Sequence, residues 1–225
     1  MKKNIFVALD FNSLEKALDV TSKVKDQIAG VKIGTELYAI CGTEGLKKFD
    51  EFNIPIFLDL KLNDIPNQVK KTVMALSSTK SIKHLTLHTM GSLEMLRAAQ
   101  DVSGSIELLG VTILTSWDKK NLQSIGLNNS LSDQIKLLVN TAIDAKLPGI
   151  ISSAQDIPLV RSISKDLKIF CPGIRESSSK QDQKRVMSYA DFTKIADDKC
   201  FAVIGRPIIE GDPVQNIKKI IQSAE

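Results

Sequence analysis

The sequence IPIFLDLKLNDIP, residues 54–66, places an apolar strand beside three charged side chains. Side chains alternate between the two faces of a strand. One face is apolar and suited to packing under helices, and it consists of Ile56, Leu58, Leu60 and Leu62. The other face carries Phe57, Asp59 and Lys61, and Asp64 follows at the start of the next helix. Because charged side chains do not pack under a helix, we expect the second face to point into the mouth of a barrel.

The same alternation of a short apolar run and a longer amphipathic run continues along the chain. Strands are predicted at 4–10, 30–34, 54–62, 83–89, 106–115, 148–153, 167–172 and 201–205. Helices are predicted at 13–28, 43–52, 65–78, 91–102, 131–146, 155–165, 188–197 and 213–223. A doubly wound open α/β sheet alternates in the same way, but the number of strands favours a (β/α)8 TIM barrel. No linker rich in Pro, Gly or Ser divides the chain, so residues 1–225 are predicted to form one domain.

The composition narrows the class of protein. Of 225 residues, 43% are hydrophobic and 25% are charged, which allows an ordinary buried core. The net charge is +4 without a basic block, so an anionic small substrate fits and no nucleic-acid partner is expected. Cys41, Cys171 and Cys200 lack metal-ligand spacing and are expected to be reduced thiols of a cytoplasmic protein. No segment approaches the roughly 18 apolar residues of a membrane span, so no membrane partner is expected.

Polar residues collect where the predicted strands end, which is where barrels place their active sites. Asp10 ends the first strand and Lys32 lies near the end of the second. Acidic neighbours favour the protonated form of a lysine such as Lys61. A fixed ammonium group can donate a proton and stabilise developing negative charge. The alternative is a structural ion pair of Asp59 with Lys61, with Asp64 as the cap of the next helix.

Two further segments suit a phosphorylated substrate. Residues 205–207, Gly-Arg-Pro, suit a phosphate group: the glycine lets the backbone approach closely, the start of the next helix offers free N–H groups, and the arginine supplies a charged guanidinium. The alternative is a surface arginine on a turn. Residues 172–185 are polar and aperiodic and are expected to form a long loop, either a lid over a bound anion or a solvated loop without a role. Thr115 and Ser116 follow the fifth strand and are placed either to hydrogen-bond a polar heterocycle or to form a simple turn.

Motifs along essentially the whole chain resemble the orotidine 5′-phosphate decarboxylase family. They are VALD at 7–10, GVKIG at 30–34, DLKLNDIP at 59–66, LHTMG at 87–91, LTS at 114–116, PGIR at 172–175, DQKR at 182–185 and IGRPI at 204–208. The D-x-K-x-x-D segment alone is shared with related sugar-phosphate enzymes, whereas its occurrence together with PGIR, DQ-x-R and IGR is far more specific. The resemblance implies a homodimeric barrel without metal or cofactor. It also implies a carboxy-lyase that converts orotidine 5′-monophosphate into uridine 5′-monophosphate and CO2, the final step of de novo pyrimidine biosynthesis.

The resemblance also implies a role for each catalytic residue. Lys61 protonates C6 of the pyrimidine as CO2 leaves, and Asp59 lies against the departing carboxylate and holds Lys61 in place. Lys32 and Asp64 complete the charged array, with Asp64 reaching into the site of the neighbouring subunit. The implied substrate-binding residues are Asp10, Lys32, Thr115, Ser116, Pro172, Arg175, Gln183, Gly205, Arg206, Ile65 and Gln68. By part of the substrate, these are Asp10 and Lys32 for the ribose, Thr115 and Ser116 for the pyrimidine edge, Arg175, Gly205 and Arg206 for the phosphate, and Gln183 as a bridge between phosphate and base.

Two residues depart from the common form of the motif. Asn63 stands where family members often have histidine, and its role there is secondary. Gln68 stands in place of a threonine that contacts the ribose from the partner subunit. Its amide still donates and accepts hydrogen bonds but is longer. The resemblance therefore does not imply that Gln68 makes the same contact with the ribose as the threonine.

Two other functions remain compatible with the pattern. One is a magnesium-dependent enzyme of the same superfamily, such as a keto-gulonate-phosphate decarboxylase or a hexulose-phosphate synthase. Such an enzyme needs an added carboxylate ligand, for which Glu36 after the second strand is the candidate. The other is a non-catalytic barrel that binds uridine monophosphate and releases no CO2.

Overall fold

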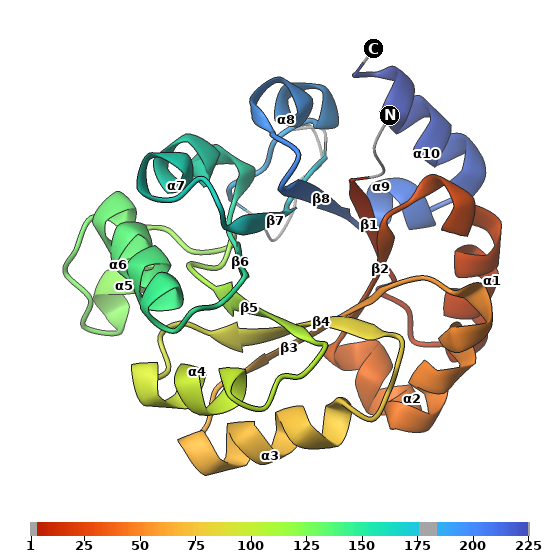
Figure 1. Ribbon diagram of the computed structural model, residues 1–225. Helices are drawn as coiled ribbons and strands as arrows, with labels where there is room; N and C mark the ends of the chain where they lie inside the picture. The colour runs from red at the N-terminus through yellow and green to blue at the C-terminus, as the bar shows by residue number, and fades with distance from the viewer. Residues whose placement is uncertain (1–3, 176–183, 225) are drawn as a thin grey trace.

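Parallel strands form a closed barrel in the part of the chain that the structure describes, residues 4–175 and 184–224 of a computed structural model. The strands follow one another around the barrel in sequence order (Figure 1). They are β1 (Ile5–Ala8), β2 (Gly30–Gly34), β3 (Ile56–Leu62), β4 (Ile82–His88), β5 (Glu107–Val111), β6 (Gly149–Ile151), β7 (Lys168–Pro172) and β8 (Cys200–Ile204). Val7 of β1 pairs with Ile204 of β8, which closes the barrel. The predicted TIM barrel is confirmed, and the open sheet is excluded.

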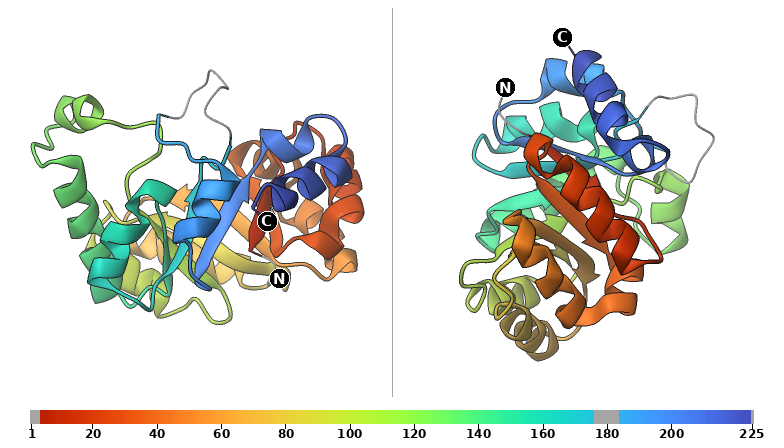
Figure 2. Two further views of the ribbon diagram at one scale, coloured as in Figure 1. Left: turned by 90° about the horizontal axis from the view of Figure 1, so that it is seen from above. Right: turned by 90° about the vertical axis from the view of Figure 1, so that its right-hand side faces the viewer.

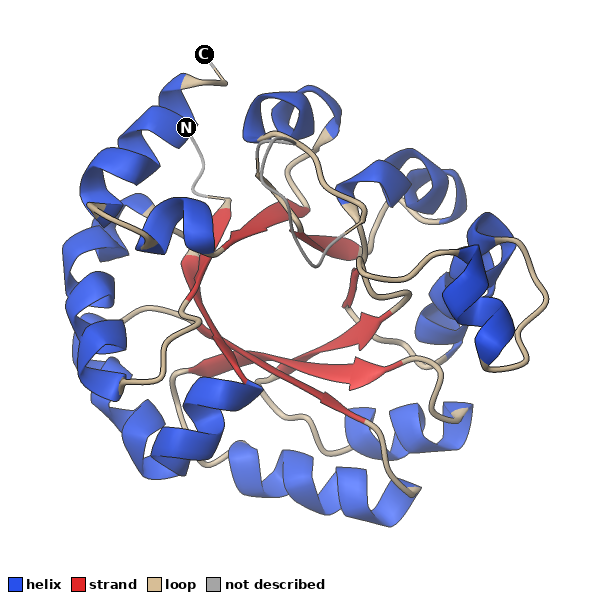
Figure 3. Cartoon of the chain, turned by 180° about the vertical axis from the view of Figure 1, so that it is seen from behind, coloured by secondary structure: helices blue, strands red, loops and turns tan. Residues whose placement is uncertain are grey.

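Helices surround the barrel as an outer layer (Figures 2 and 3). The α-helices are α1 (Leu14–Val24), α2 (Thr35–Lys47), α3 (Pro66–Leu76), α4 (Leu93–Gln100), α5 (Lys119–Ser124), α6 (Leu131–Asp144), α7 (Ile157–Ile163), α8 (Tyr189–Ile195), α9 (Arg206–Ile209) and α10 (Pro213–Gln222). Short 3-10 helices are η1 (Lys25–Gln27), η2 (Lys48–Phe52) and η3 (Ala154–Asp156). Serine side chains such as Ser13 and Ser92 accept backbone N–H groups at the helix starts. Among the described helices, none has the length and apolar character needed to cross a membrane.

The structure differs from the predicted elements at several places. The helix expected at 43–52 begins at Thr35, directly after β2, and Gly42 interrupts it with a φ of 56°. The sequence missed α5 and α9, because helices of six and four residues are too short to show helical periodicity. The strand expected to reach Thr115 ends at Val111. The next residue, Thr112, still donates its backbone N–H and its hydroxyl to the carbonyl of Ile151, at 3.1 and 2.8 Å, and the chain bends at Ile113.

Two layers of apolar side chains hold the barrel together. The outer layer lies between strands and helices and includes Ile56 and Leu58, as the alternation in β3 predicted. The inner layer consists of Phe6, Ala8, Phe57, Leu109, Val111, Ile151, Phe170 and Val203. The rings of Phe6, Phe57 and Phe170 lie with centroids 5.2 to 6.0 Å apart. This aromatic cluster fills the barrel. On the inward face of β3, Phe57 therefore packs in the core, and the charged residues Asp59 and Lys61 follow it toward the carboxyl end of the strand.

A charged cluster lies at the amino ends of the strands. His84 Nδ1 lies 3.2 Å from Oε2 of Glu107, and Lys168 Nζ lies 2.5 Å from Oε1. The contact with His84, followed by that with Lys168, lowers the pKa of Glu107 to about 2 against the opposing effect of burial. Glu107 therefore stays ionised in the folded protein down to strongly acidic pH.

We predict that Glu107→Gln lowers the Tm at pH 7 and that the difference from the parent protein closes in acid. Because the folded-state pKa lies below the ordinary value of 4.5, the cluster stabilises the fold above about pH 4.5, and this contribution is lost as pH falls toward 2. The Glu107 side chain is 34% exposed, so we expect about 1 kcal/mol, or roughly 2–4 °C. Thermal unfolding at pH 7, 5 and 3 measures this, with exposed Glu51→Gln as the control. An equal difference at every pH would contradict the prediction.

Candidate active site

A cavity of about 440 Å³ opens at the carboxyl ends of the barrel strands. Its apolar floor includes Phe57, Val111, Ile151 and Val203. The predicted site residues that line it are Asp10, Lys32, Asp59, Lys61, Thr115, Ser116, Pro172, Arg175, Gly205 and Arg206. The cavity has the size of a small-molecule site and carries charges above an apolar floor. The fold therefore brings together most of the side chains that the sequence selected.

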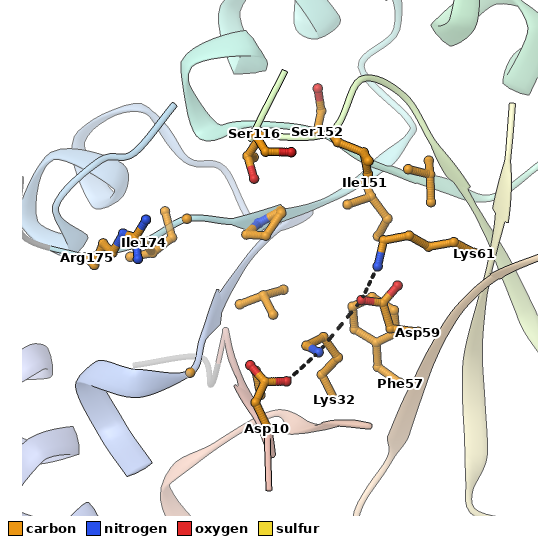
Figure 4. A pocket seen from close by; sticks show the side chains of 18 of the residues that line it. Asp10, Lys32, Phe57, Asp59, Lys61, Ser116, Ile151, Ser152, Ile174 and Arg175 are labelled. Atoms are coloured by element: carbon orange, nitrogen blue, oxygen red, sulfur yellow. Dashed lines mark hydrogen bonds and ion pairs between the residues drawn. The ribbon is translucent and has the colours of Figure 1, made fainter. Parts of the chain in front are cut away.

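Two lysines and two aspartates form a connected charged array in this cavity, shown in Figure 4. Lys61 Nζ lies 2.8 Å from Oδ2 of Asp59. Lys32 Nζ lies 3.8 Å from the same oxygen and 3.1 Å from Oδ1 of Asp10. The side chains of Lys32 and Asp59 are each 12% exposed, whereas that of Lys61 is 35% exposed. Lys61 thus has a partner for its charge and remains open to the cavity.

Asp59 is held in its charged form. Burial alone raises the pKa of this carboxyl group, but the charges of Lys32 and Lys61, with hydrogen bonds from Lys61 and Thr86, outweigh burial and lower the pKa. The pKa of His88 is lowered by burial and then by the charge of Lys61. Both effects favour the neutral form of the His88 side chain.

Lys61 does not occupy a regular strand position. Its φ is 50°, in the left-handed region that few side chains adopt. The pairing of β3 with β4 shifts register between Leu58↔Leu85 and Leu62↔Leu87, so four residue steps on β3 match two on β4. Bulges of this kind redirect side chains and occur near active sites. The alternation of side chains along the strand correctly predicted that Lys61 points into the cavity, but it did not predict the bulge that turns the side chain there.

Two glycines leave space for the charged array. A Cβ at Gly34 would lie 3.3 Å from Nζ of Lys32, and a Cβ at Gly205 would lie 3.2 Å from Oδ2 of Asp10. Both distances are tighter than ordinary contacts. Glycine at these positions lets the β2 and β8 backbones approach the Asp10–Lys32 pair closely.

Arg175 lies apart from Lys61 in the cavity. Arg175 and Lys61 are on opposite sides of the view in Figure 4. Arg175 is 9% exposed, and its backbone N–H donates to the carbonyl of Met187 at 2.8 Å. Arg206 begins α9 directly after Gly205. The cavity can thus hold an elongated molecule with an anionic group toward the arginines and a reacting centre at Lys61.

Sequence reasoning missed a buried pair that supports the cavity wall. Arg185 Nη1 donates to Oδ2 of Asp156 at 2.7 Å, and Nη2 donates to the carbonyl of Ile113 at 2.8 Å. Ser152, which lines the cavity, donates to the same oxygen of Asp156 at 2.8 Å. The backbone N–H of Arg185 donates to the carbonyl of Thr115 at 3.2 Å. The position of Ser152 directly after β6 was the signal available in the sequence, whereas the pairing of Arg185 with Asp156 spans 29 residues and depends on the fold.

Comparison with known proteins places the chain in a family. A family model described as "Orotidine 5'-phosphate decarboxylase / HUMPS family" matches residues 3–220. The chain belongs to this family. An orotidine 5′-phosphate decarboxylase of Ehrlichia chaffeensis is 41% identical over 224 residues, which cover 97% of this chain and 96% of the relative. The family predicted from the motifs is confirmed.

Solved structures agree with this placement in the orotidine 5′-phosphate decarboxylase family. The crystal structure of an orotidine 5′-phosphate decarboxylase from Lactobacillus acidophilus has a TM-score of 0.84 at 27% identity and covers all of both chains. An orotidine 5′-monophosphate decarboxylase from Methanocaldococcus jannaschii, complexed with the inhibitor BMP, has a TM-score of 0.81 at 21% identity, with 99% of each chain covered. At that identity the likeness shows the shared fold alone.

Part of the orotidine 5′-phosphate decarboxylase motif lies outside the cavity. Asp64 and Gln68 line a separate hollow beside α3, and Ile65 is 64% exposed. Gln183 lies outside the described residues. The alternative in which Asp64 caps the helix is wrong: Ile65 occupies the cap position because Pro66 begins α3, and Asp64 instead accepts the N–H of Ile65 at 2.6 Å.

The carboxylates do not form the metal site that a magnesium-dependent enzyme needs. Glu36 lies in a small hollow with Asp10 and Asp59. Yet in residues 4–175 and 184–224 no three His, Cys, Asp or Glu side chains are close enough to hold a metal ion. Two ammonium groups already approach Oδ2 of Asp59, and their charge opposes a divalent cation there. The magnesium-dependent alternative is therefore not favoured.

Proposed function

We propose that this chain converts orotidine 5′-monophosphate into uridine 5′-monophosphate and CO2, with Lys61 as the proton donor. The observation that carries the proposal is the contact of Lys61 with ionised Asp59 inside a cavity that also contains Arg175 and Arg206. The pyrimidine then lies toward Lys61 and the 5′-phosphate toward the arginines. The relative from Ehrlichia chaffeensis carries the name of this activity.

The reaction breaks one carbon–carbon bond and forms one carbon–hydrogen bond. When the bond between C6 and the carboxylate breaks, its electron pair stays on C6 and CO2 leaves. Lys61 Nζ gives a proton to C6, and the neutral amine then takes a proton from water. A positive charge fixed beside C6 interacts more strongly with the carbanion than with the neutral carbon that precedes it, so it lowers the barrier. Asp59 lies against the departing carboxylate and fixes Lys61 through the 2.8 Å contact.

The remaining cavity residues bind the parts of the nucleotide that do not react. Asp10 and Lys32 contact the ribose, Thr115 and Ser116 face the pyrimidine edge beside Pro172, and Arg175, Gly205 and Arg206 bind the phosphate. Enzymes lower reaction barriers by roughly 8–23 kcal/mol, which is more than one ammonium group supplies. Binding energy from the distant phosphate therefore helps to hold the substrate against the charged array.

We propose further that two copies of the chain form a homodimer in which Asp64, Ile65 and Gln68 complete the site of the partner. All three lie outside the cavity of their own chain. Ile65 at the start of α3 and Met74 toward its end expose 64% and 53% of their surface, which a second copy would cover. A fully active monomer in analytical ultracentrifugation would contradict this arrangement.

The activity is tested by following the absorbance of orotidine 5′-monophosphate with the purified protein, before and after treatment with EDTA. We expect rapid conversion to uridine 5′-monophosphate that EDTA leaves unchanged, because the charged array consists of ammonium and carboxylate groups. Loss of activity on EDTA treatment with recovery on adding magnesium would support the sugar-phosphate alternative. Binding of uridine 5′-monophosphate without any conversion would support a non-catalytic barrel.

A further inference from the structure

A threonine on the strand next to Lys61 joins the two residues that the proposed reaction depends on most. Thr86 belongs to β4 and is fully buried. Its Oγ1 accepts the backbone N–H of Lys61 at 2.8 Å. The same hydroxyl donates to Oδ1 of Asp59 at 3.0 Å. One hydroxyl thus connects the backbone of the proton donor to the carboxylate that neutralises its charge.

The position of Thr86 follows from the bulge in β3. Thr86 lies between Leu85 and Leu87, the two residues of β4 whose partners on β3 are four residues apart. A regular ladder would pair the N–H of Lys61 with a backbone carbonyl, but the bulge removes that partner. The side chain of Thr86 takes its place. A buried N–H without a partner is unfavourable, so the hydroxyl stabilises the left-handed backbone of Lys61.

The same hydroxyl fixes the rotation of the Asp59 carboxylate. Thr86 binds Oδ1, while the ammonium groups of Lys61 and Lys32 approach Oδ2. A threonine hydroxyl has one proton to donate, and its lone pairs accept. Because it accepts from Lys61 N–H, its proton is directed to Asp59. Each carboxylate oxygen therefore has its own partner, and the oxygen that faces Lys61 is held toward the cavity.

We propose that Thr86 is a positioning residue for decarboxylation, which holds the bulged backbone of Lys61 and the orientation of Asp59 in one geometry. The inference rests on the proposed function of Lys61. Thr86 does not line the cavity and contacts no substrate. It acts on the rate of the chemical step through Lys61 and Asp59, and it leaves the arginine end of the site untouched.

The test compares Thr86→Val, which keeps the shape and removes both hydrogen bonds, with Thr86→Ser, which keeps the hydroxyl. We expect Thr86→Val to lower kcat about 100-fold, since small displacements of catalytic groups have effects of this size, with KM changed only about threefold. Thr86→Ser is expected to recover most of the lost kcat. Thr89→Val is the matched control, because this buried threonine follows β4 and donates to the carbonyl of Val111 at 2.7 Å, away from the charged array.

The outcomes separate this inference from the proposed function. If the parent protein does not convert orotidine 5′-monophosphate, the proposed function fails. If the parent protein does and Thr86→Val keeps its kcat, or Thr86→Ser is as impaired as Thr86→Val, only the role of Thr86 is overturned. Equal kcat losses in Thr86→Val and Thr89→Val would also overturn it, as a general effect of losing a buried hydrogen bond. If Thr86→Val does not fold, Thr86→Ala against Thr86→Ser gives the same comparison.

Discussion

Replacing Lys61 with alanine is expected to abolish turnover while the protein still binds uridine 5′-monophosphate. The variant loses both the proton donor and the positive charge beside C6. General acid catalysis contributes about 10²- to 10⁴-fold, and removing one charge-stabilising donor costs about 10²- to 10³-fold. We therefore expect kcat to fall by roughly 10⁴-fold or more. The arginine end of the cavity is unchanged in this variant, so product binding should change much less.

The measurement needs two readouts on the same protein. Single-turnover conversion of orotidine 5′-monophosphate reports the chemical step, and calorimetric titration with uridine 5′-monophosphate reports binding. Lys194→Ala is a suitable control, because Lys194 is exposed on α8 and forms an ion pair with exposed Asp191 at the surface. Near-normal turnover in Lys61→Ala would refute the mechanism. Lys61→Arg keeps a positive charge but holds its proton too tightly to donate it, so it should remain strongly impaired.

The sequence predicts the barrel well because each strand and helix leaves a local pattern. The apolar runs and their alternation located the strands, and the rule that barrel sites lie at carboxyl ends selected Asp10, Lys32 and Lys61 without knowledge of the family. Their position along each strand was sufficient, since parallel strands in a barrel end at the same rim.

The register between neighbouring strands could not be predicted from these local patterns. The left-handed backbone of Lys61 depends on a shift in register between β3 and β4, and no property of residues 59–62 alone encodes that shift. The contact of Thr86 with Asp59 spans 27 residues and follows from the same register. Asp64 illustrates a different limit. Its motif is local and easily found, but whether it serves its own site or the site of a partner depends on a second chain.

Replacing Arg206 with alanine is expected to raise KM strongly while lowering kcat much less. A hydrogen bond to a charged group contributes about 1.5–3 kcal/mol, which corresponds to a roughly 10- to 150-fold rise in KM. Arg206 lies at the start of α9, whereas the proposed mechanism has the reacting carbon at Lys61. Some loss of kcat is still expected, because part of the phosphate binding energy is used to hold the substrate against the charged array.

Orotidine without its phosphate provides the decisive control for Arg206. If Arg206 acts on the phosphate, the parent protein and Arg206→Ala should process orotidine equally slowly, and the two should differ only with the phosphorylated substrate. Arg97→Ala, a change at an exposed arginine on α4 whose guanidinium donates to the carbonyl of Asp144, should leave both substrates unaffected. An unchanged KM for orotidine 5′-monophosphate in Arg206→Ala would remove the phosphate assignment. The phosphate would then have to lie away from α9, toward Arg175, which lines the same cavity.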